Sequence, residues 1–598
     1  MGVPRLAPWI RKTFPKCWNH FIGGQAQSKG KKPFTLYVDG VYIDANGLLH
    51  LAAQEVFNYG DCKRKMNPYD KMTYEDRIKA VYFVFFKKLL LVTSISIPTK
   101  VLYIAIDGPA PLAKQAQQRQ RRFVSADSAS TIGFDTTIIT PGTDFMFELT
   151  KYMHYAIRKE MMPGGKWRNI VVYFSPPTVP GEGEHKIMDH IRKEVAEGDL
   201  IGSRCMFGPD GDLLMLCLAT HVPRMHLLRM DQYAPGYFDL LDMDIVADGL
   251  ARVFNTKRER MNLINDFILL GFFVGNDFLH KLQMFLYLED GLNLMVKQYS
   301  TMLSAGIHLT TDGSINFRTG LLHLVKQMAQ RELWFIQDQA VYPHTDPRFV
   351  DYTLLGAMVY STVAQDGSRV DPALVPETRK DGKLNFPAYR QAYYVKSGIT
   401  DSGEIYTPSA EVKKMCLNYL TSFCWVFNYY IHGIPSWTHY YDGYYAPLMT
   451  DLAVVIERLT DDEISQILAP PKGEPSLPFV QLLSVISPKS VHLLPEFLHP
   501  LMLSPESPLV QAGYYPDSFE IDYEGKTKEH MGVALLPYID VDEVRRCYLE
   551  VLEARPEERY TKNTFGSLER FRYDPAYSAT YISDYGTIKK MQIRKSLE

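Results

Sequence analysis

The sequence predicts an α/β fold in which a parallel, twisted sheet is flanked by helices, with a second, mostly helical region after it. In the first half of the 598 residues, short apolar runs alternate with helical patterns, as in strand–helix–strand units. These runs are continuously apolar, which is typical of strands buried on both faces. Acidic residues follow several of the runs, at the strand ends where parallel sheets gather their ligands.

Five apolar runs are predicted to be strands: 35–44, 100–107, 169–175, 204–208 and 225–230. Helical periodicity occupies 45–58, 74–95, 111–124, 143–161, 184–196 and 211–219. From about 245 to 305 the pattern is helical, and a polar stretch with Pro and Gly at 366–383 predicts an exposed loop. We therefore expect a first region at 1–330, a linker-containing segment at 331–385 and a second region at 386–598.

The composition is that of a globular chain, with 46% hydrophobic and 22% charged residues. A formal net charge of −3 argues against a protein that coats nucleic acid through bulk electrostatics, but it leaves room for a local basic pocket. Seven cysteines without a CxxC pair or zinc spacing predict reduced thiols and an intracellular protein. Lys87 and Lys88 interrupt the most apolar stretch, so no membrane span is expected.

Seven carboxylates form the central pattern. Each ends an apolar run or lies in a glycine-rich turn: Asp44, Asp107, Glu182, Glu184, Asp210, Asp212 and Asp277. One such residue alone is more often a turn former or helix cap. Together they suit Mg²⁺ or Mn²⁺, which prefer hard oxygen ligands. Two divalent ions about 3.5–4 Å apart are the usual arrangement for cleaving phosphodiesters, so the set predicts a metal-dependent nuclease.

A basic helix is predicted directly after Asp107. Its residues Lys114, Gln118, Arg121 and Arg122 are spaced i, i+4, i+7 and i+8, which places them on one face. A solvated charged face is the ordinary interpretation of such a run. No acidic residue is interleaved here, however, and arginine and lysine are the side chains that bind phosphate. We therefore favour a pocket for a terminal phosphate beside the metal site.

At this point the motifs resemble those of the XRN-type 5′→3′ exoribonucleases. The first region carries DANGLLH, AIDGPAPLAKQAQQRQRRF, VPGEGEHKIMDHIR, GPDGDLLMLCLATHVP and LLGFFVGNDF in order. The second carries AYRQAYYVKSGI, YLTSFCWVFNYYIHGIPSWTHYYDGYYAP, SLPFVQLLSVIS and PEERYTKNTFG. The resemblance covers nearly the whole chain.

The resemblance implies a PIN/flap-nuclease-like fold whose second region walls the active site. It implies processive hydrolysis of single-stranded RNA with a 5′-monophosphate to nucleoside 5′-monophosphates. The seven carboxylates are then the catalytic residues that hold two Mg²⁺ ions, with Mn²⁺ as a substitute. Lys114, Gln118, Arg121 and Arg122 form the 5′-phosphate pocket. His50 is implied to stack on the terminal base, with Trp437 as the candidate partner; ordinary packing is the alternative for both.

Departures from the family pattern shape three further expectations. His439 stands where many relatives have a second tryptophan, so either Trp437 or His439 takes the stacking position. LHKLQM follows GNDF where the family usually has IPHLP. Neither a zinc knuckle nor a long carboxyl-terminal extension is recognised, so we expect a compact catalytic core, as in a viral or streamlined member. A monomer and a cytoplasmic location are the default expectations.

Three other interpretations remain open from the sequence. A 5′ flap-type DNA nuclease would share the acidic core. A catalytically silent RNA-binding protein would bind RNA regardless of chelators. A structural α/β protein would use the carboxylates only as turn formers.

Overall fold

The computed structural model describes residues 3, 5–23, 34–126, 133–198, 201–231, 234–286, 291–339, 346–359, 382–526, 528–555 and 560–598. These residues form two units that interleave along the chain. The helical unit comprises Met1–Leu6, Gly249–Lys472 and Ser518–Leu536, and the sheet unit comprises Ala7–Asp248, Gly473–Asp517 and Pro537–Glu598. The predicted loop at 366–383 lies almost entirely outside the described residues. The division into 1–330, 331–385 and 386–598 stays a prediction about the sequence.

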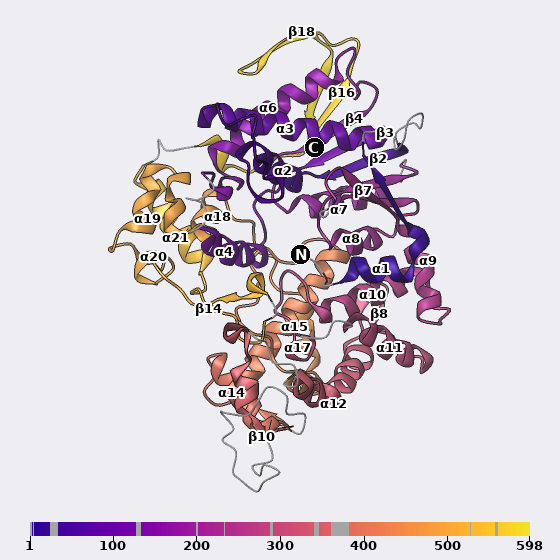
Figure 1. Cartoon of the computed structure of the whole chain (residues 1–598), viewed down its shortest axis with the longest axis vertical. Coiled ribbons are helices and arrows are strands. Elements are labelled where there is room, and N and C mark those ends of the chain that lie inside the picture. The colour runs from indigo at the N-terminus through magenta and orange to yellow at the C-terminus, as the bar shows by residue number, and fades with distance from the viewer. Residues whose placement is uncertain are drawn as a thin grey trace. The chain divides into compact units, whose positions relative to one another are not determined.

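A nine-stranded sheet forms the centre of the sheet unit in the described part of the chain (Figure 1). Its strands are ordered β1-β7-β6-β5-β2-β3-β4-β16-β19. Their bounds are β1 Trp18–Ile22, β2 Leu36–Asp44, β3 Ser96–Ala105, β4 Val171–Ser175, β5 Arg204–Phe207, β6 Met225–Met230, β7 Tyr237–Asp242, β16 Glu569–Tyr573 and β19 Ile593–Leu597. Strands β6, β5, β2, β3 and β4 pair in parallel. They are the five predicted runs, so the parallel core is confirmed.

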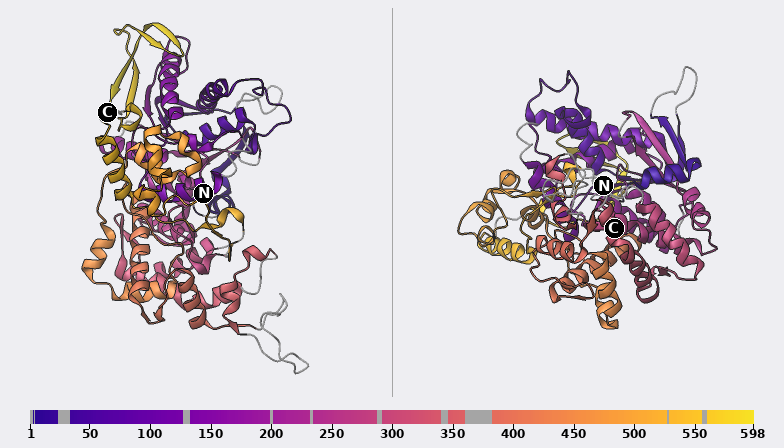
Figure 2. Two further views of the ribbon diagram at one scale, coloured as in Figure 1. Left: turned by 90° about the vertical axis from the view of Figure 1, so that its left-hand side faces the viewer. Right: turned by 60° about the horizontal axis from the view of Figure 1, so that its bottom comes forward.

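Antiparallel strands extend both edges of this sheet, and the sequence did not reveal them. β7 and β1 continue one edge, and β16 and β19 continue the other. The last two come from the end of the chain, drawn in yellow, which returns to the sheet beside β4 (labelled in Figure 1 and turned by 90° in Figure 2, left). β19 carries the exposed residues Arg594 and Lys595, as charged edge strands often do. Such half-exposed strands lack the continuous apolar run by which the core strands were found.

Helices cover both faces of the sheet because successive strand residues point to opposite sides. Val41 and Ile43 of β2 are fully buried in a core that also contains residues of α2, α3 and α6. On the opposite face, Tyr103 of β3 contacts His190 of α7, with ring centroids 4.6 Å apart. The sheet is therefore a middle layer, as predicted.

The helices of the sheet unit between residues 45 and 220 lie close to their predicted ranges, and no ranges were predicted for the helices after residue 470. Their bounds are α2 Asn46–Phe57, α3 Tyr74–Ile95, α4 Leu112–Ala126, α6 Asp144–Met161, α7 Gly183–Ala196, α8 Leu213–Ala219, α18 Pro478–Val485, α19 His499–Leu503, α20 Pro508–Gln511 and α21 Val541–Glu553. α1 Leu6–Thr13 and α9 Met243–Val253 cross from one unit to the other. Among the described helices, none combines the length and apolarity needed to cross a membrane.

The helical unit is built mainly from α10 Arg260–Val274, α11 Gly291–Ser304, α12 Leu322–Gln339, α13 Tyr352–Gly356, α14 Phe386–Lys396, α15 Ala410–Ile431, α16 Met449–Arg458 and α17 Asp461–Leu468. The predicted change to a helical pattern after residue 245 is confirmed. Its strands are short pairs: β8 Thr310–Thr311 with β9 Ser314–Ile315, β10 Met358–Val359 with β11 Lys383–Leu384, β12 Gly403–Glu404 with β13 Thr407–Pro408, and β14 Ile521–Asp522 with β15 Val533–Ala534. A hairpin of β17 Ala579–Ser583 and β18 Gly586–Met591 belongs to the sheet unit.

Candidate functional site

Six of the seven predicted carboxylates follow the carboxyl ends of the parallel strands. They are Asp44 at the end of β2, Asp107 after β3, Glu182 and Glu184 at the start of α7 after β4, and Asp210 and Asp212 between β5 and α8. Because parallel strands end at the same edge of a sheet, the topology brings these side chains to one place.

The cluster is tight at its centre. Oxygen atoms of Asp44, Glu184 and Asp210 all lie within 4.8 Å of one another, and the first two residues are buried. The backbone N–H of Gly183 donates to Asp107 Oδ1 at 2.6 Å. A Cβ atom on Gly183 would lie 2.6 Å from Asp44 Oδ1. The glycine between the two glutamates therefore lets the first turn of α7 approach both aspartates.

Like charges and burial both disfavour ionisation in this cluster. Burial, and then the charges of Asp107, Asp210 and Asp212, raise the pKa of Asp44 well above its usual value. Burial and the neighbouring carboxylates, Asp212 first, likewise raise the pKa of Glu184. Asp44 Oδ1 is buried and has no hydrogen-bond partner in the described part of the chain. A buried oxygen without a donor, among other carboxylates, fits a hard divalent cation.

Asn46 supports this cluster and was not identified from the sequence. Its Nδ2 donates to Asp107 Oδ2 at 2.7 Å, and its Oδ1 accepts the N–H of Asp107 at 3.0 Å. These two bonds hold the carboxylate and the backbone N–H of Asp107 against the start of α2, which follows the neighbouring strand β2. Its position two residues after Asp44 was the only available signal in the sequence.

Lys186 is a second support that the sequence did not reveal, although it lies in the same GEGEHK motif. Its buried Nζ donates to the carbonyl oxygens of Ile106 at 2.5 Å, Pro176 at 3.2 Å and Val179 at 3.3 Å. Burial lowers the pKa of Lys186 to about 7, although the carboxylate of Asp107 opposes the decrease. One ammonium has the three donors that three carbonyls require, so Lys186 ties the residue before Asp107 to the turn that precedes Glu182.

The predicted phosphate-binding residues lie on α4, beside the carboxylates. Lys114 Nζ is 2.7 Å from Glu182 Oε2. Arg122 Nη1 is buried and has no hydrogen-bond partner within the described residues. Burial lowers the pKa of Arg122 to about 10, opposed by Asp135 and Asp107. Gln118 is partly exposed and Arg121 is exposed on the same helix.

The opposite face of α4 is anchored in the sheet unit. Arg119 is buried, and its guanidinium donates to the carbonyl oxygen of Ser484 at 3.2 Å and to that of Tyr514. Its Cζ also lies 4.4 Å from the centroid of the Phe123 ring. The side of the helix that carries Arg119 is therefore closed to a ligand, whereas Gln118 and Arg121, which the sequence spacing identified, lie on a side that is at least partly exposed.

His50 lies on α2, one turn after Asn46, and is partly buried. Burial lowers its pKa, whereas Asp107 opposes the decrease and Arg122 adds to it. The charges that act on the pKa of His50 therefore come from both the carboxylates and the basic helix.

Trp437 and His439, the two stacking candidates, both belong to the helical unit. His439 Nε2 lies 2.8 Å from Ser422 Oγ on α15, and burial lowers the pKa of His439 to about 4. Trp437 is partly exposed, and its backbone N–H donates to the carbonyl of Lys472 at 2.6 Å. The hydrogen bond of His439 makes Trp437 the better candidate for stacking on a base.

Asp277, the seventh carboxylate, also belongs to the helical unit, in the turn after α10. Asn276 Oδ1 accepts the N–H groups of Phe278 and Leu279 at 2.9 and 3.0 Å, and Gly275 has a φ of 137° that favours glycine. The GND sequence thus shapes a defined turn around Asp277. Its membership of the metal-binding set stays a prediction.

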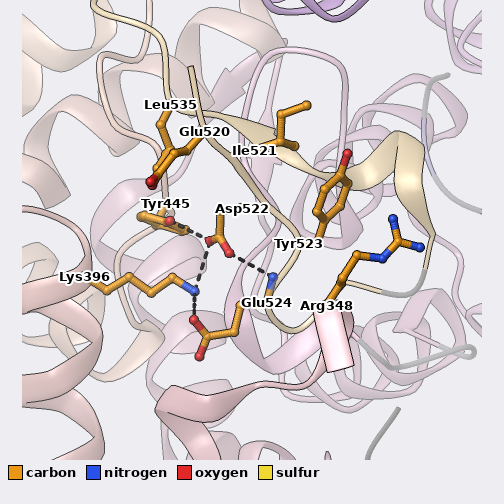
Figure 3. A pocket seen from close by; sticks show the side chains of 9 residues that line it. All are labelled: Arg348, Lys396, Tyr445, Glu520, Ile521, Asp522, Tyr523, Glu524 and Leu535. Carbon is orange, nitrogen blue, oxygen red and sulfur yellow. Dashed lines mark hydrogen bonds and ion pairs between the residues drawn. The ribbon is translucent and has the colours of Figure 1, made fainter. Parts of the chain in front are cut away.

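A pocket of about 420 Å³ lies in the helical unit (Figure 3). Lys396 Nζ contacts Asp522 at 3.0 Å and Glu524 at 2.6 Å, and Tyr445 donates its hydroxyl hydrogen to Asp522 at 2.6 Å. These charged groups already satisfy one another, so the pocket carries no functional assignment.

Two family models match this chain. One is described as the XRN 5′-3′ exonuclease N-terminus and matches residues 1–231. The other is described as the Xrn1 helical domain and matches 257–345 and 375–569. Together they include every candidate site residue named above.

Among similar proteins, human 5′-3′ exoribonuclease 1 is 29% identical over 90% of this chain, which matches 33% of the human protein. The Schizosaccharomyces pombe 5′-3′ exoribonuclease 1 is 26% identical over 98% of this chain and 51% of its own length. The Arabidopsis thaliana 5′-3′ exoribonuclease 2 is 26% identical over 94% of this chain and 68% of its own length. The chain thus spans a third to about two thirds of these relatives.

Proposed function

Because the chain belongs to the XRN family of 5′→3′ exonucleases, we propose that it is a metal-dependent exoribonuclease that acts on single-stranded RNA with a 5′-monophosphate. It removes nucleotides processively from the 5′ end and releases nucleoside 5′-monophosphates. The observation that supports this most directly is the ion pair between the basic helix α4 and the carboxylate cluster, in which Lys114 Nζ lies 2.7 Å from Glu182. Phosphate-binding cations and metal-binding carboxylates are adjacent there.

The carboxylates are proposed to hold two Mg²⁺ ions, for which Mn²⁺ can substitute. Such ions supply an activated water and stabilise charge on the leaving oxygen during phosphodiester hydrolysis. Asp44 and Glu184 contribute buried oxygens at the centre of the cluster. Asn46 holds the carboxylate of Asp107 in place through its paired hydrogen bonds. In this proposal the protein therefore provides preformed oxygen ligands.

α4 is proposed to hold the RNA 5′ end at a fixed position and so to determine which internucleotide bond is cleaved. Arg121 and Arg122 offer planar guanidinium donors and Lys114 offers a point charge, which together suit a terminal phosphate dianion. When they hold that phosphate, the first internucleotide phosphate is directed to the carboxylates. A 5′-hydroxyl end provides no charge to hold, and a triphosphate is bulkier than the pocket requires.

Base stacking is proposed for His50 and Trp437, and metal binding for Asp277, from the family resemblance. Stacking contributes roughly 1–3 kcal/mol per base without selecting sequence, which suits an enzyme that proceeds along any RNA. Asp277→Asn tests the metal role directly, since a ligand substitution reduces turnover whereas a turn residue tolerates it. We take a monomer in the cytoplasm as the simplest form of this proposal.

The proposal is tested with one RNA sequence carrying a 5′-monophosphate, 5′-hydroxyl or 5′-triphosphate, labelled at its 3′ end, with Mg²⁺ or with EDTA. We expect rapid loss of the monophosphate RNA alone, only with Mg²⁺ and without ladder intermediates. Equal cleavage of all three ends would contradict the phosphate pocket. Faster degradation of a 5′ DNA flap would instead indicate a structure-specific DNA nuclease, and RNA binding without products would indicate a silent binding protein.

A further inference from the structure

We infer that Gln481 is a positioning residue that orients the side-chain amide of Gln118 so that its NH₂ group faces the RNA 5′-phosphate. The inference rests on the proposed function and assigns to that site a residue from a distant part of the chain. Gln481 lies on α18 and is fully buried in the sheet unit, so it does not touch the substrate itself.

The orientation of the Gln481 amide is fixed by a backbone group. Its Oε1 accepts the N–H of Ala110 at 2.7 Å. A backbone N–H can only donate, so the oxygen of Gln481 must face Ala110 and its Nε2 must face away. This settles the direction of an amide whose oxygen and nitrogen are otherwise hard to tell apart.

The orientation of the Gln481 amide in turn determines the orientation of the Gln118 amide. The Nε2 of Gln481 donates to Gln118 Oε1 at 3.4 Å. The amide oxygen of Gln118 is thereby directed toward α18, and its own Nε2 is left as a donor. That Nε2 has no hydrogen-bond partner in the part of the chain that the structure describes. A phosphate accepts hydrogen bonds only, so an amide turned the other way would present a repelling oxygen.

A purely structural role is the competing explanation, because Ala110 lies in the turn between Asp107 and α4. The carbonyl of Ala110 also accepts a hydrogen bond, from Gln115 Nε2 at 2.8 Å. Loss of the Gln481 side chain could therefore disturb this turn without any effect through Gln118. The two explanations differ in how Gln481 and Gln118 depend on each other.

The first test is Gln481→Met, which keeps the length of the side chain and removes both hydrogen bonds. We expect KM for 5′-monophosphate RNA to rise about tenfold, the scale of one hydrogen bond to a charged group. We expect kcat to stay within about twofold, because the bond holds the RNA end before and during cleavage. Binding of the 5′-hydroxyl RNA should not change.

A double-mutant cycle separates the two explanations. If Gln481 acts through Gln118, then adding Gln481→Met to Gln118→Met raises KM no further. Gln115→Met is the matched control, because Gln115 contacts the same Ala110 turn but not Gln118. Its effect on KM should add to that of Gln118→Met, and it should weaken binding of the 5′-hydroxyl RNA as much as binding of the 5′-monophosphate RNA.

The inference would be overturned if the effects of Gln481→Met and Gln118→Met on KM were additive. It would also be overturned if Gln481→Met weakened binding of the 5′-monophosphate and 5′-hydroxyl RNAs equally. If the methionine variant does not fold, Gln481→Asn gives the same comparison, since its shorter amide cannot reach both partners. Failure of the proposed function is recognised separately, because the unmodified protein would then show no preference for the monophosphate end.

Discussion

Asp44 shows how burial and neighbouring carboxylates act together on a single residue of the candidate site. Its carboxylate is buried, and burial together with neighbouring carboxylates raises its pKa well above the usual value. Holding that group ionised at neutral pH disfavours the folded state unless a cation compensates it. Perturbed carboxylates of this kind are typical of functional sites.

We predict that Asp44→Asn abolishes turnover and yet stabilises the cation-free protein. Activity should fall by at least about 10³-fold, since a metal ligand supports several kcal/mol of transition-state stabilisation. In EDTA the unfolding midpoint should rise by roughly 1–3 °C, because a buried charge is removed. The measurement is thermal unfolding with EDTA and with Mg²⁺.

Mg²⁺ should raise the midpoint of the unmodified protein but not that of Asp44→Asn. Asp189→Asn is the control, because Asp189 lies on the exposed side of α7 and pairs there with Arg192. A lower midpoint for Asp44→Asn in EDTA would contradict the explanation from charge repulsion.

At the scale of the element, the two faces of α4 differ in their surroundings: one is anchored in the sheet unit and the other is exposed. Arg119 anchors the helix through the carbonyls of Ser484 and Tyr514. Arg121, two residues later, is exposed on the opposite side. The same residue type therefore serves stability on one face and, in our proposal, RNA-end binding on the other.

We predict opposite outcomes for the same substitution at these two positions. Arg119→Met should destabilise the sheet unit by about 1–3 kcal/mol, since it leaves buried carbonyls without a donor. Arg121→Met should leave stability unchanged within about 0.5 kcal/mol and weaken the preference for 5′-monophosphate RNA. Urea unfolding and degradation assays on both variants check this. Loss of stability in Arg121→Met, or none in Arg119→Met, would show that the faces are assigned wrongly.

For the whole molecule, the two units are expected to respond to different solution conditions. In our proposal, divalent cations act on the carboxylates of the sheet unit. In the helical unit, the fully buried Glu332 of α12 accepts the N–H groups of Met449 at 2.6 Å and Thr450 at 2.7 Å, at the first turn of α16. Burial raises the pKa of Glu332 to about 7, although these two hydrogen bonds oppose the increase.

We predict that Glu332 makes the helical unit less stable as pH rises from 5 to 8. A carboxyl whose pKa is higher in the folded state binds more protons there. Its contribution to stability is therefore complete at pH values below about 4.5 and is lost as the pH rises to about 7. The difference between the unmodified protein and Glu332→Gln should change by about 1–3 kcal/mol across this range.

Hydrogen exchange at pH 5 and pH 8 measures this effect by region. The change should appear in α12 and α16, whereas the strands of the sheet unit serve as the internal control. A pH dependence that is the same in Glu332→Gln as in the unmodified protein would assign the effect to other groups.

Local patterns were sufficient to find the five parallel strands, because each strand is a continuous apolar run bounded by helical periodicity. They were also sufficient to propose the carboxylates, since each one follows such a run. They were not sufficient for β16, whose pairing with β4 joins residues about 400 positions apart along the chain, or for β19, which pairs with β16. Nor did they reveal Asn46 and Lys186, whose roles depend on hydrogen bonds to other turns.

The sequence by itself determined the order of strands and helices in the first half, the carboxylates at the strand ends and the cationic face of α4. These are properties of short stretches, set by side-chain periodicity and charge. Tertiary structure alone decided which oxygens meet within 4.8 Å, how Asp107 is held and that Gln481 reaches Gln118. Those depend on distances between segments that the chain brings together only on folding, and burial then changes the pKa values of the groups that meet.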